Sequence, residues 1–219
     1  MRSIAIMNNK SDSTATQTLS QKPLTEVEGI VEAFPSEDEF LRCGLYNPDG
    51  QTRLCCNVPD CWFGDHPTLC MLDEAYQKPV GEAWLIPQLA NISEYAGTKD
   101  KLTKAQIKEC AFVIRTTYGY LKVSEFMLFC HRFKAGFYGD FFGAVSPLTI
   151  TTALRQFMND RAVAIDHHEQ EKREAKLQEE KKSAVSYEEY CRMRGITAST
   201  SPIAKILNKF SPAPRKREI

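Results

Sequence analysis

The sequence predicts a mainly α-helical protein, with a compact multi-helix domain, a charged extended helix and disordered termini. Apolar residues recur at spacings of three and four between residues 80 and 165, which is the period of a helix with one buried face. Residues that start and stop helices, such as Thr103 and Gly136, stand at the ends of these apolar runs. Beside the helices we expect at most one small β-hairpin, at about residues 137–145.

The N-terminal part is predicted to hold a leader and a small segment of helices and loops. Residues 1–23 are rich in Ser, Thr, Asn and Gln and show no periodicity, which predicts a disordered leader. Residues 24–66 begin with an apolar helical face, followed by a capping-box pattern at Ser36 and Glu39. The turn sequence NPDG at residues 47–50 and a loop that carries cysteines complete this segment.

Residues 67–165 are predicted to form the helical core domain. One run of apolar residues contains Pro87, which should kink or split its helix. Thr103 is placed to cap the next helix, whose apolar stripe consists of Ile107, Cys110, Ala111, Ile114 and Tyr118. A third helix is expected to open at Ser124 and to end at Gly136.

The C-terminal part is predicted to be a helix that changes character along its length. Ser146 and Pro147 suit its N-cap and first helical position. The helix has an apolar face as far as Ile165, and residues 166–195 comprise its charged continuation plus a short C-terminal helix. Residues 196–219 are expected to be a flexible basic tail.

Charge is distributed unevenly along the chain, although 28 basic and 28 acidic side chains cancel overall. Residues 20–100 carry 14 acidic and 5 basic groups, whereas residues 101–161 carry 9 basic and 4 acidic groups. Such asymmetry is often functional. No apolar run approaches the ~20 residues of a membrane span, and no secretory signal opens the chain, so we expect a cytoplasmic protein.

The stretch CCNVPDCWFGDHPTLC is the candidate metal site. Its thiols and imidazole could surround Zn²⁺ tetrahedrally, and the candidate ligands are Cys55, Cys61, His66 and Cys70. Against this, the stretch has no C-x₂-C pair, and cysteine is a common small buried hydrophobe. A structural role for these residues is therefore the leading interpretation, with a zinc site as the alternative.

No catalytic constellation emerges from the remaining residues. Nothing matches the phosphate-binding pattern G-x-x-x-x-G-K-[ST]. Cys130 and His131 are adjacent, but neighbours on a helix point about 100° apart, so they are not expected to form a thiolate–imidazole pair. The aromatic residues around Cys130 should also keep its thiol neutral. We therefore expect no enzymatic activity and no cofactor.

A basic helical face is the candidate nucleic-acid site. Its members lie at spacings of 3, 4, 7 and 7 and are Lys101, Lys104, Lys108, Arg115 and Lys122. Each cation that contacts a phosphate would release counterions and so favour binding. The same pattern describes the solvated face of an ordinary helix, so both interpretations stay open.

Base-specific reading of DNA is not expected. A helix, the break YGYLK, a second helix and an aromatic hairpin loosely suggest a winged helix-turn-helix. The second helix would then read the bases, but its sequence SEFMLFCHRFKAG is apolar around most of its circumference. Such a helix belongs in a core or against a partner.

The stretch RFKAGFYGDFFGAVSP at residues 132–147 concentrates aromatic side chains between two helices. We expect Phe137, Phe141 and Phe142 to turn inward and orient the helices, while Tyr138 keeps its hydroxyl in solvent. The alternative is an exposed platform on which nucleic-acid bases stack.

Three short patterns occur within residues 67–161. They are LT-x-x-Q-I at residues 102–107, L-K-x-x-E at residues 121–125 and F-K-x-G-x-Y-G at residues 133–139. In these patterns the chain resembles an uncharacterised family of small proteins carried by prophages and mobile elements of gut bacteria. The resemblance implies a setting in mobile DNA, and it implies no established activity or catalytic residue.

The residues and the resemblance together predict a non-enzymatic accessory or adaptor protein of mobile-DNA replication or maintenance. It would act through protein partners and through non-specific contacts with a phosphate backbone. The first alternative is a zinc-stabilised protein-interaction module built on the cysteine stretch, and the second is a cryptic enzyme.

Overall fold

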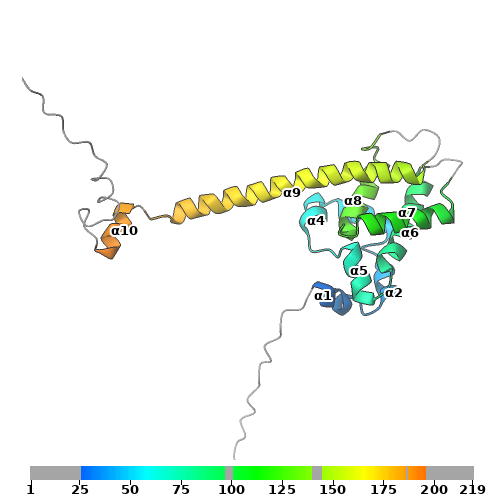
Figure 1. Ribbon diagram of the computed structural model, residues 1–219, viewed down its shortest axis with the longest axis horizontal. Coiled ribbons are helices and arrows are strands. Elements are labelled where there is room, and N and C mark those ends of the chain that lie inside the picture. Colours follow the sequence, from blue (N-terminus) through cyan, green and yellow to red (C-terminus); the bar gives the residue numbers. More distant parts are fainter. Residues whose placement is uncertain (1–25, 97–100, 140–144, 186, 196–219) are drawn as a thin grey trace, which may run out of the picture. The chain divides into compact units, whose positions relative to one another are not determined.

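The computed structural model describes residues 26–96, 101–139, 145–185 and 187–195, which form a mainly α-helical protein (Figure 1). Within these ranges there is no β-strand, and the helices of the first unit pack compactly on one another, so the predicted fold class is confirmed. The chain divides into two units, residues 1–159 and 160–219.

Three predictions fall on other parts of the chain. The expected leader (residues 1–23), the expected tail (residues 196–219) and residues 140–144 of the expected hairpin lie outside the described residues. The first part of that hairpin, residues 137–139, belongs to the turn that follows a helix.

Short helices form the start of the first unit. They are α1 (Glu26–Ala33), α2 (Glu37–Leu41), the 3₁₀ helix η1 (Pro48–Gly50), α3 (Gln51–Cys55) and α4 (Val58–Phe63). Ser36 caps α2 as predicted, because its Oγ accepts a hydrogen bond from the backbone N–H of Glu39 at 3.3 Å. The cysteine-bearing stretch, which the sequence predicted as a loop, contains α3 and α4 instead.

Local capping explains why this stretch is helical. The Asn47 side chain accepts from the Gly50 N–H at 2.9 Å, and the Asn57 side chain accepts from the Asp60 N–H at 3.4 Å. Each Asn is followed by a proline in the first helical turn, where the missing N–H of proline costs nothing. These short elements therefore start from a cap and a proline rather than from an apolar period.

Four longer helices complete the core. They are α5 (Leu69–Tyr76), α6 (Val80–Tyr95), α7 (Lys104–Thr117) and α8 (Val123–Lys134). α8 is central, since every residue from 123 to 130 is buried and α3, α4 and α6 all pack against it. This burial confirms that the apolar second helix is a core helix. α7 packs on α6, which leaves the opposite face of α7 exposed.

The helix boundaries agree with the sequence in some places and differ in others. Thr103 caps α7 as expected, and Gln106 completes a capping box with it. α6 is not split, because the helix continues through Pro87. α8 is capped at Lys122 rather than Ser124, whose buried hydroxyl donates to the Cys61 carbonyl at 2.9 Å.

The last long helix, α9 (Pro147–Ser183), belongs to both units. Its N-cap is Ser146, whose Oγ accepts from the Thr149 N–H at 3.1 Å. Within the first unit α9 buries an apolar face, and the ring of Phe157 stacks on Trp62 with centroids 4.9 Å apart.

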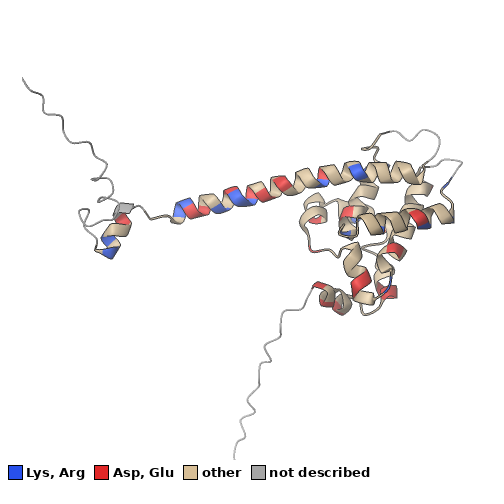
Figure 2. Ribbon diagram, viewed as in Figure 1, with Lys and Arg blue, Asp and Glu red and all other residues tan. Residues whose placement is uncertain are grey.

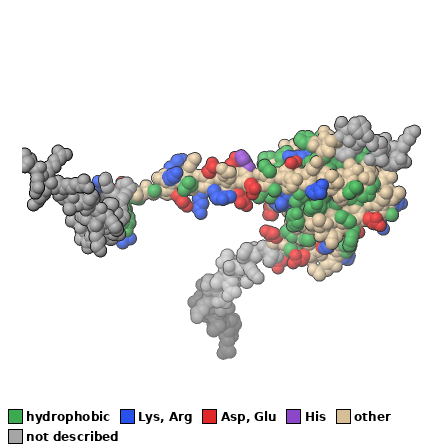
Figure 3. Space-filling view, turned by 45° about the horizontal axis from the view of Figure 1, so that its top comes forward, with side chains coloured by type: hydrophobic (Ala, Val, Ile, Leu, Met, Phe, Trp, Pro, Cys, Tyr) green, Lys and Arg blue, Asp and Glu red, His purple; other side chains and the backbone are tan. Residues whose placement is uncertain are grey.

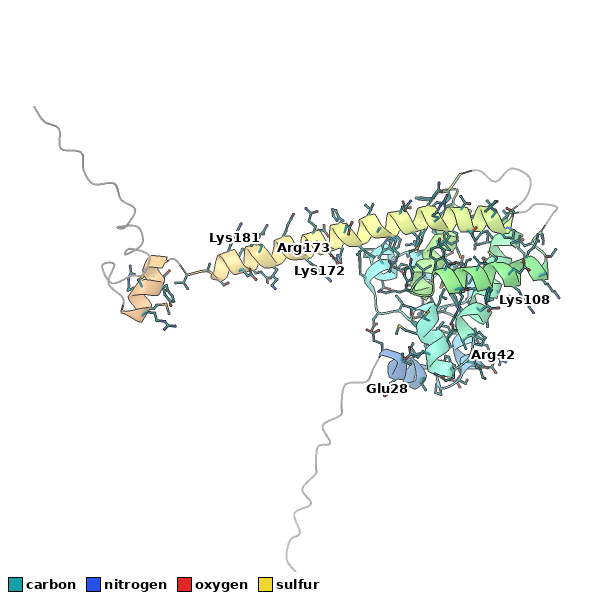
Figure 4. The ribbon with its side chains drawn as sticks, viewed as in Figure 1. Glu28, Arg42, Lys108, Lys172, Arg173 and Lys181 are labelled. Carbon is teal, nitrogen blue, oxygen red and sulfur yellow. The ribbon has the colours of Figure 1, made fainter. Side chains whose placement is uncertain are left out.

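The second unit contains the charged part of α9 and the short helix α10 (Tyr187–Arg194). Acidic and basic side chains alternate along α9 (Figure 2), and Arg173 pairs with Glu169 one turn away. Lys172, Arg173 and Lys181 all come from this exposed part of the helix (Figure 4). Among the described helices, none is both long enough and apolar enough to cross a lipid bilayer.

Candidate functional site

A carboxylate on α5 joins three helices of the core. Asp73 accepts a hydrogen bond from the Gly81 N–H at 2.8 Å through Oδ1 and from the Arg115 guanidinium through Oδ2. The first contact supports the start of α6, and the second ties α7 to α5. The hydrogen bond from Arg115 to Asp73 raises the pKa of Arg115, whose guanidinium stays protonated.

A glycine permits the close approach of α5 and α6. A Cβ at Gly81 would lie 2.7 Å from the Leu69 carbonyl oxygen, which is shorter than any ordinary contact. Since that neighbour is backbone, it cannot rotate away. The arrangement of α5, α6 and α7 therefore depends on the Gly81–Asp73 contact and on the absence of a side chain at position 81.

An open groove lies between these three helices, with a volume of about 620 Å³. Its lining combines charged side chains with apolar surface and consists of Cys70, Asp73, Glu74, Gln77, Lys78, Pro79, Glu82, Phe112 and Arg115. The two cations of the groove are already neutralised, since Arg115 pairs with Asp73 and Lys78 pairs with Glu37 at 2.7 Å. The remaining carboxylates therefore give the groove a negative character.

The rim of the groove carries exposed apolar side chains. Phe112, which lines the groove, is 57% exposed, and its neighbour Val113 is 48% exposed. Both belong to the face of α7 that no other described helix covers. We call Phe112, Val113 and the groove beside them the α7 surface. Figure 3 shows that hydrophobic side chains reach the surface of the first unit in several patches.

The five basic residues do not form one face. Lys101, Lys104 and Lys108 are exposed at the start of α7, and Lys108 is labelled on α7 in Figure 4. Arg115 is held by Asp73, and the Lys122 ammonium donates to the Gly64 carbonyl at 2.8 Å and to the Trp62 carbonyl at 3.3 Å. Two of the five cations thus stabilise the fold, and three remain on the surface.

The candidate zinc ligands are not arranged around one point. Cys55 and Cys61 lie in the core and share a hydrogen bond, and this bond and burial raise the pKa of the Cys55 thiol. The exposed Cys70 lines the groove on α5. Over the described residues, no three His, Cys, Asp or Glu side chains are placed to hold a metal ion.

His66 takes part in a contact that the sequence did not predict. Its Nε2 lies 3.2 Å from Asp60 Oδ2, and its Nδ1 lies 3.1 Å from the hydroxyl of Tyr46. The order carboxylate, imidazole, hydroxyl is that of a catalytic triad. Burial, together with nearby acidic groups, raises the pKa of Tyr46 to about 12, so the phenol keeps its proton and is a poor nucleophile.

A buried polar network supports the helices around α8. The Lys134 ammonium donates to Gln51 Oε1 at 2.7 Å and to Asn91 Oδ1, and Gln51 donates to Gln88 Oε1 at 2.6 Å. Gln88 in turn donates to the Tyr46 carbonyl at 2.9 Å. Burial lowers the pKa of Lys134, but these acceptors compensate for its charge. The network therefore stabilises the core and engages the amine of Lys134 in hydrogen bonds.

The expected orientation of two aromatic rings was wrong. Phe137 is 69% exposed rather than turned inward, and the guanidinium of Arg132 lies 5.7 Å from its ring centroid. Tyr138 points the other way, with its ring 5.8 Å from that of Phe129 and its hydroxyl oxygen buried. Gly136, at φ +79°, reverses the chain just before the two residues and so sets their directions. The other expected inward rings, Phe141 and Phe142, lie outside the described residues.

Comparison with known proteins gives a partial match to one family and no activity. Residues 101–198 match a family of unknown function (DUF6633). That range begins just before α7 and includes α8, α9 and α10. No curated protein and no solved structure shows significant similarity to the chain. The chain is thus similar, over α7 to α10, to an uncharacterised family.

Proposed function

We propose that this protein is a non-enzymatic adaptor that binds a protein partner on the α7 surface. The observation that carries the proposal is the exposure of Phe112 and Val113 at the rim of the groove. Exposed apolar side chains are common singly, but an aromatic ring at the edge of a groove is typical of a protein-binding surface. The matched family includes α7 and so includes this apolar rim.

The absence of catalysis is supported by the chemistry of the best-placed polar cluster. In the Asp60–His66–Tyr46 arrangement the group in the position of the nucleophile is a buried phenol. The raised pKa of Tyr46 disfavours the phenolate that a nucleophile or base would need. We therefore interpret this cluster as a support for the packing of Tyr46 rather than as a catalytic group.

The proposed cellular setting is the replication or maintenance of mobile DNA. It is supported by the resemblance of residues 67–161 to proteins of prophages and mobile elements. Contacts with a phosphate backbone are an accessory part of the proposal, supported by the exposed amines of Lys101, Lys104 and Lys108. Their test is the salt dependence of DNA binding by the full chain and by a Lys104→Glu, Lys108→Glu variant, which should bind more weakly.

The test of the adaptor function is site-specific photocrosslinking in the native host. A photoreactive amino acid replaces Phe112 in the full-length chain, and a matched chain carries it at Leu148, which is 74% exposed on α9. We expect position 112 to give a covalent adduct with one protein, identified by mass spectrometry, and position 148 to give none with that protein.

A different crosslinking result would contradict the adaptor function. If position 112 yields no adduct beyond the background of position 148 while both chains are folded and abundant, the α7 surface is not the site of an adaptor. Circular dichroism of the purified chains checks folding, and unmodified protein competes with the crosslink when binding is specific.

A further inference from the structure

The side chain of Phe112 on α7 is exposed, and the groove beside it carries more carboxylates than cations. A partner that covered only the apolar rim would bury unpaired carboxylates next to it, which is unfavourable without compensation. The partner must therefore bring both an apolar side chain and positive charge.

The unpaired charge can be assigned to particular residues. Asp73 is satisfied by Arg115 and by the Gly81 N–H, and Lys78 is satisfied by Glu37. Glu74 and Glu82 line the groove, and neither forms an ion pair within 4 Å among the described residues, although the charge of Glu82 also acts on Arg115. These two carboxylates are thus available to an incoming cation.

Among the residues that line the groove, the cations are Lys78 and Arg115, and both are paired with carboxylates. The exposed amines of Lys104 and Lys108 belong to an earlier part of α7 and do not line the groove. A polyanion is therefore disfavoured at this position.

The volume of the groove limits how much of a partner it can hold. A volume of about 620 Å³ falls within the roughly 300–1,000 Å³ of pockets that hold small ligands. It can take a few side chains but not a folded domain. A short protruding segment of a partner fits this space.

We propose that the α7 surface binds a basic segment of a protein partner, with Lys or Arg side chains on Glu74 and Glu82 and an apolar side chain on Phe112. This inference rests on the proposed adaptor function and names the chemistry of its partner. Electrostatic attraction would speed the encounter and weaken as salt screens it, whereas contact with Phe112 would slow dissociation.

The test is a selection from a surface-displayed library of random twelve-residue peptides, with the full-length chain as bait. We expect enriched peptides to carry net positive charge and at least one large apolar residue. Titration of the best synthetic peptide should give a Kd that rises at least about tenfold in a Glu74→Gln, Glu82→Gln variant. It should also rise at least about tenfold with Phe112→Ala.

A variant with the same loss of charge elsewhere is the control. Glu32 on α1 and Glu94 on α6 are exposed and do not line the groove, so Glu32→Gln with Glu94→Gln should change the Kd by less than about twofold. The affinity for the basic peptide should also fall at least about tenfold between low and high salt for the unmodified chain.

Different experimental results would contradict the basic-segment proposal and the adaptor function. Enrichment of neutral or acidic peptides, no enrichment, or a Kd unchanged by Glu74→Gln, Glu82→Gln would overturn the basic-segment proposal. A position-112 crosslink to an acidic or neutral segment would leave the adaptor function standing while this proposal falls. A crosslink to a second copy of the chain would identify a self-association surface instead and would also overturn it.

Discussion

Gly119, in the turn between α7 and α8, lies directly against the thiol of Cys70 on α5. The Gly119 carbonyl accepts a hydrogen bond from the Cys70 N–H at 2.8 Å, and a Cβ at position 119 would stand 2.3 Å from Cys70 Sγ. The turn can follow α5 closely only because position 119 has no side chain.

A side chain at position 119 should therefore destabilise the fold, and shortening the side chain at position 70 should relieve part of this effect. We expect Gly119→Ala to lower the free energy of unfolding by about 1–2 kcal/mol through overpacking. Cys70→Ala in the same chain should restore part of the loss, since it removes the clash with Sγ, whereas the contact with the Arg115 carbonyl oxygen, at 3.0 Å, stays tight. Urea denaturation of the single and double variants measures the coupling.

The control for that experiment is Gly44→Ala, because a Cβ at Gly44 would meet no atom within 4 Å. It should be neutral or slightly stabilising, by loss of freedom in the unfolded chain. A Gly119→Ala chain as stable as the Gly44→Ala chain would show that the turn does not approach α5 so closely.

Asp73 should be far more important for stability than the carboxylate next to it. Asp73→Ala leaves the Gly81 N–H and the Arg115 guanidinium without their acceptor, and we expect a loss of about 2–3 kcal/mol. Glu74→Ala, at the adjacent exposed position, should cost less than about 0.5 kcal/mol. Urea denaturation compares the two, and equal losses would contradict the role of Asp73 in joining α5, α6 and α7.

The burial of the thiols predicts how fast each cysteine reacts with a maleimide in the folded protein. Cys56 and Cys70 are exposed and should react fast, and Cys43 should react at an intermediate rate. The buried thiols should react at least about 100-fold more slowly, since they require local opening of roughly 3 kcal/mol, and they are Cys55, Cys61, Cys110, Cys130 and Cys191.

Three of these thiols also have raised pKa values: Cys55, through its hydrogen bond with Cys61 and burial, and Cys110 and Cys130, through burial. Because the thiolate is the nucleophile, a raised pKa slows the reaction further. Mass spectrometry after short labelling identifies the modified residues, and all eight should react in urea. Fast labelling of Cys55 or Cys61 in buffer would refute the packing of α3 and α4.

The sequence predicted the helices that carry a long apolar stripe. Ile107, Cys110, Ala111 and Ile114 are buried as expected, Tyr118 at the end of the stripe is half-buried, and Thr103 caps the helix as expected. Fourteen residues supply enough turns for the period to be unmistakable. By contrast, α3 and α4 have five and six residues and show no period, so the sequence predicted a loop there. Of the two, only α4 has a start signal of its own, Asn57 with a proline in the first turn.

The groove depends on contacts that a local pattern cannot reveal. Asp73 and Arg115 are 42 residues apart, and nothing in the spacing around either residue indicates that they meet. Arg115 was therefore placed with the basic face rather than in an ion pair. The directions of Phe137 and Tyr138 were also inaccessible, because a turn has no period and the ring of Phe129 decides which of them is covered.

Tyr46 predicts a specific loss of stability at alkaline pH. Burial, followed by the charges of Cys43, Asp60 and Asp65, raises its pKa from 10.0 to about 12. Between these values the unfolded chain has lost the phenol proton while the folded chain retains it. The folded state then binds more protons, so the free energy of unfolding falls as pH rises from about 10 to about 12, by at most about 2.7 kcal/mol.

Replacing the phenol isolates this contribution from that of other alkaline groups, such as Cys110, whose pKa burial raises to about 11. Tyr46→Phe should be less stable at neutral pH, because His66 loses the hydrogen bond from the hydroxyl. Its stability should then fall less steeply than that of the unmodified chain above pH 10. Tyr120→Phe, at an exposed ring, should keep the full slope. Urea denaturation at a series of pH values supplies the slopes, and identical slopes for Tyr46→Phe and the unmodified chain would mean that the Tyr46 hydroxyl ionises in the folded protein as it does in water.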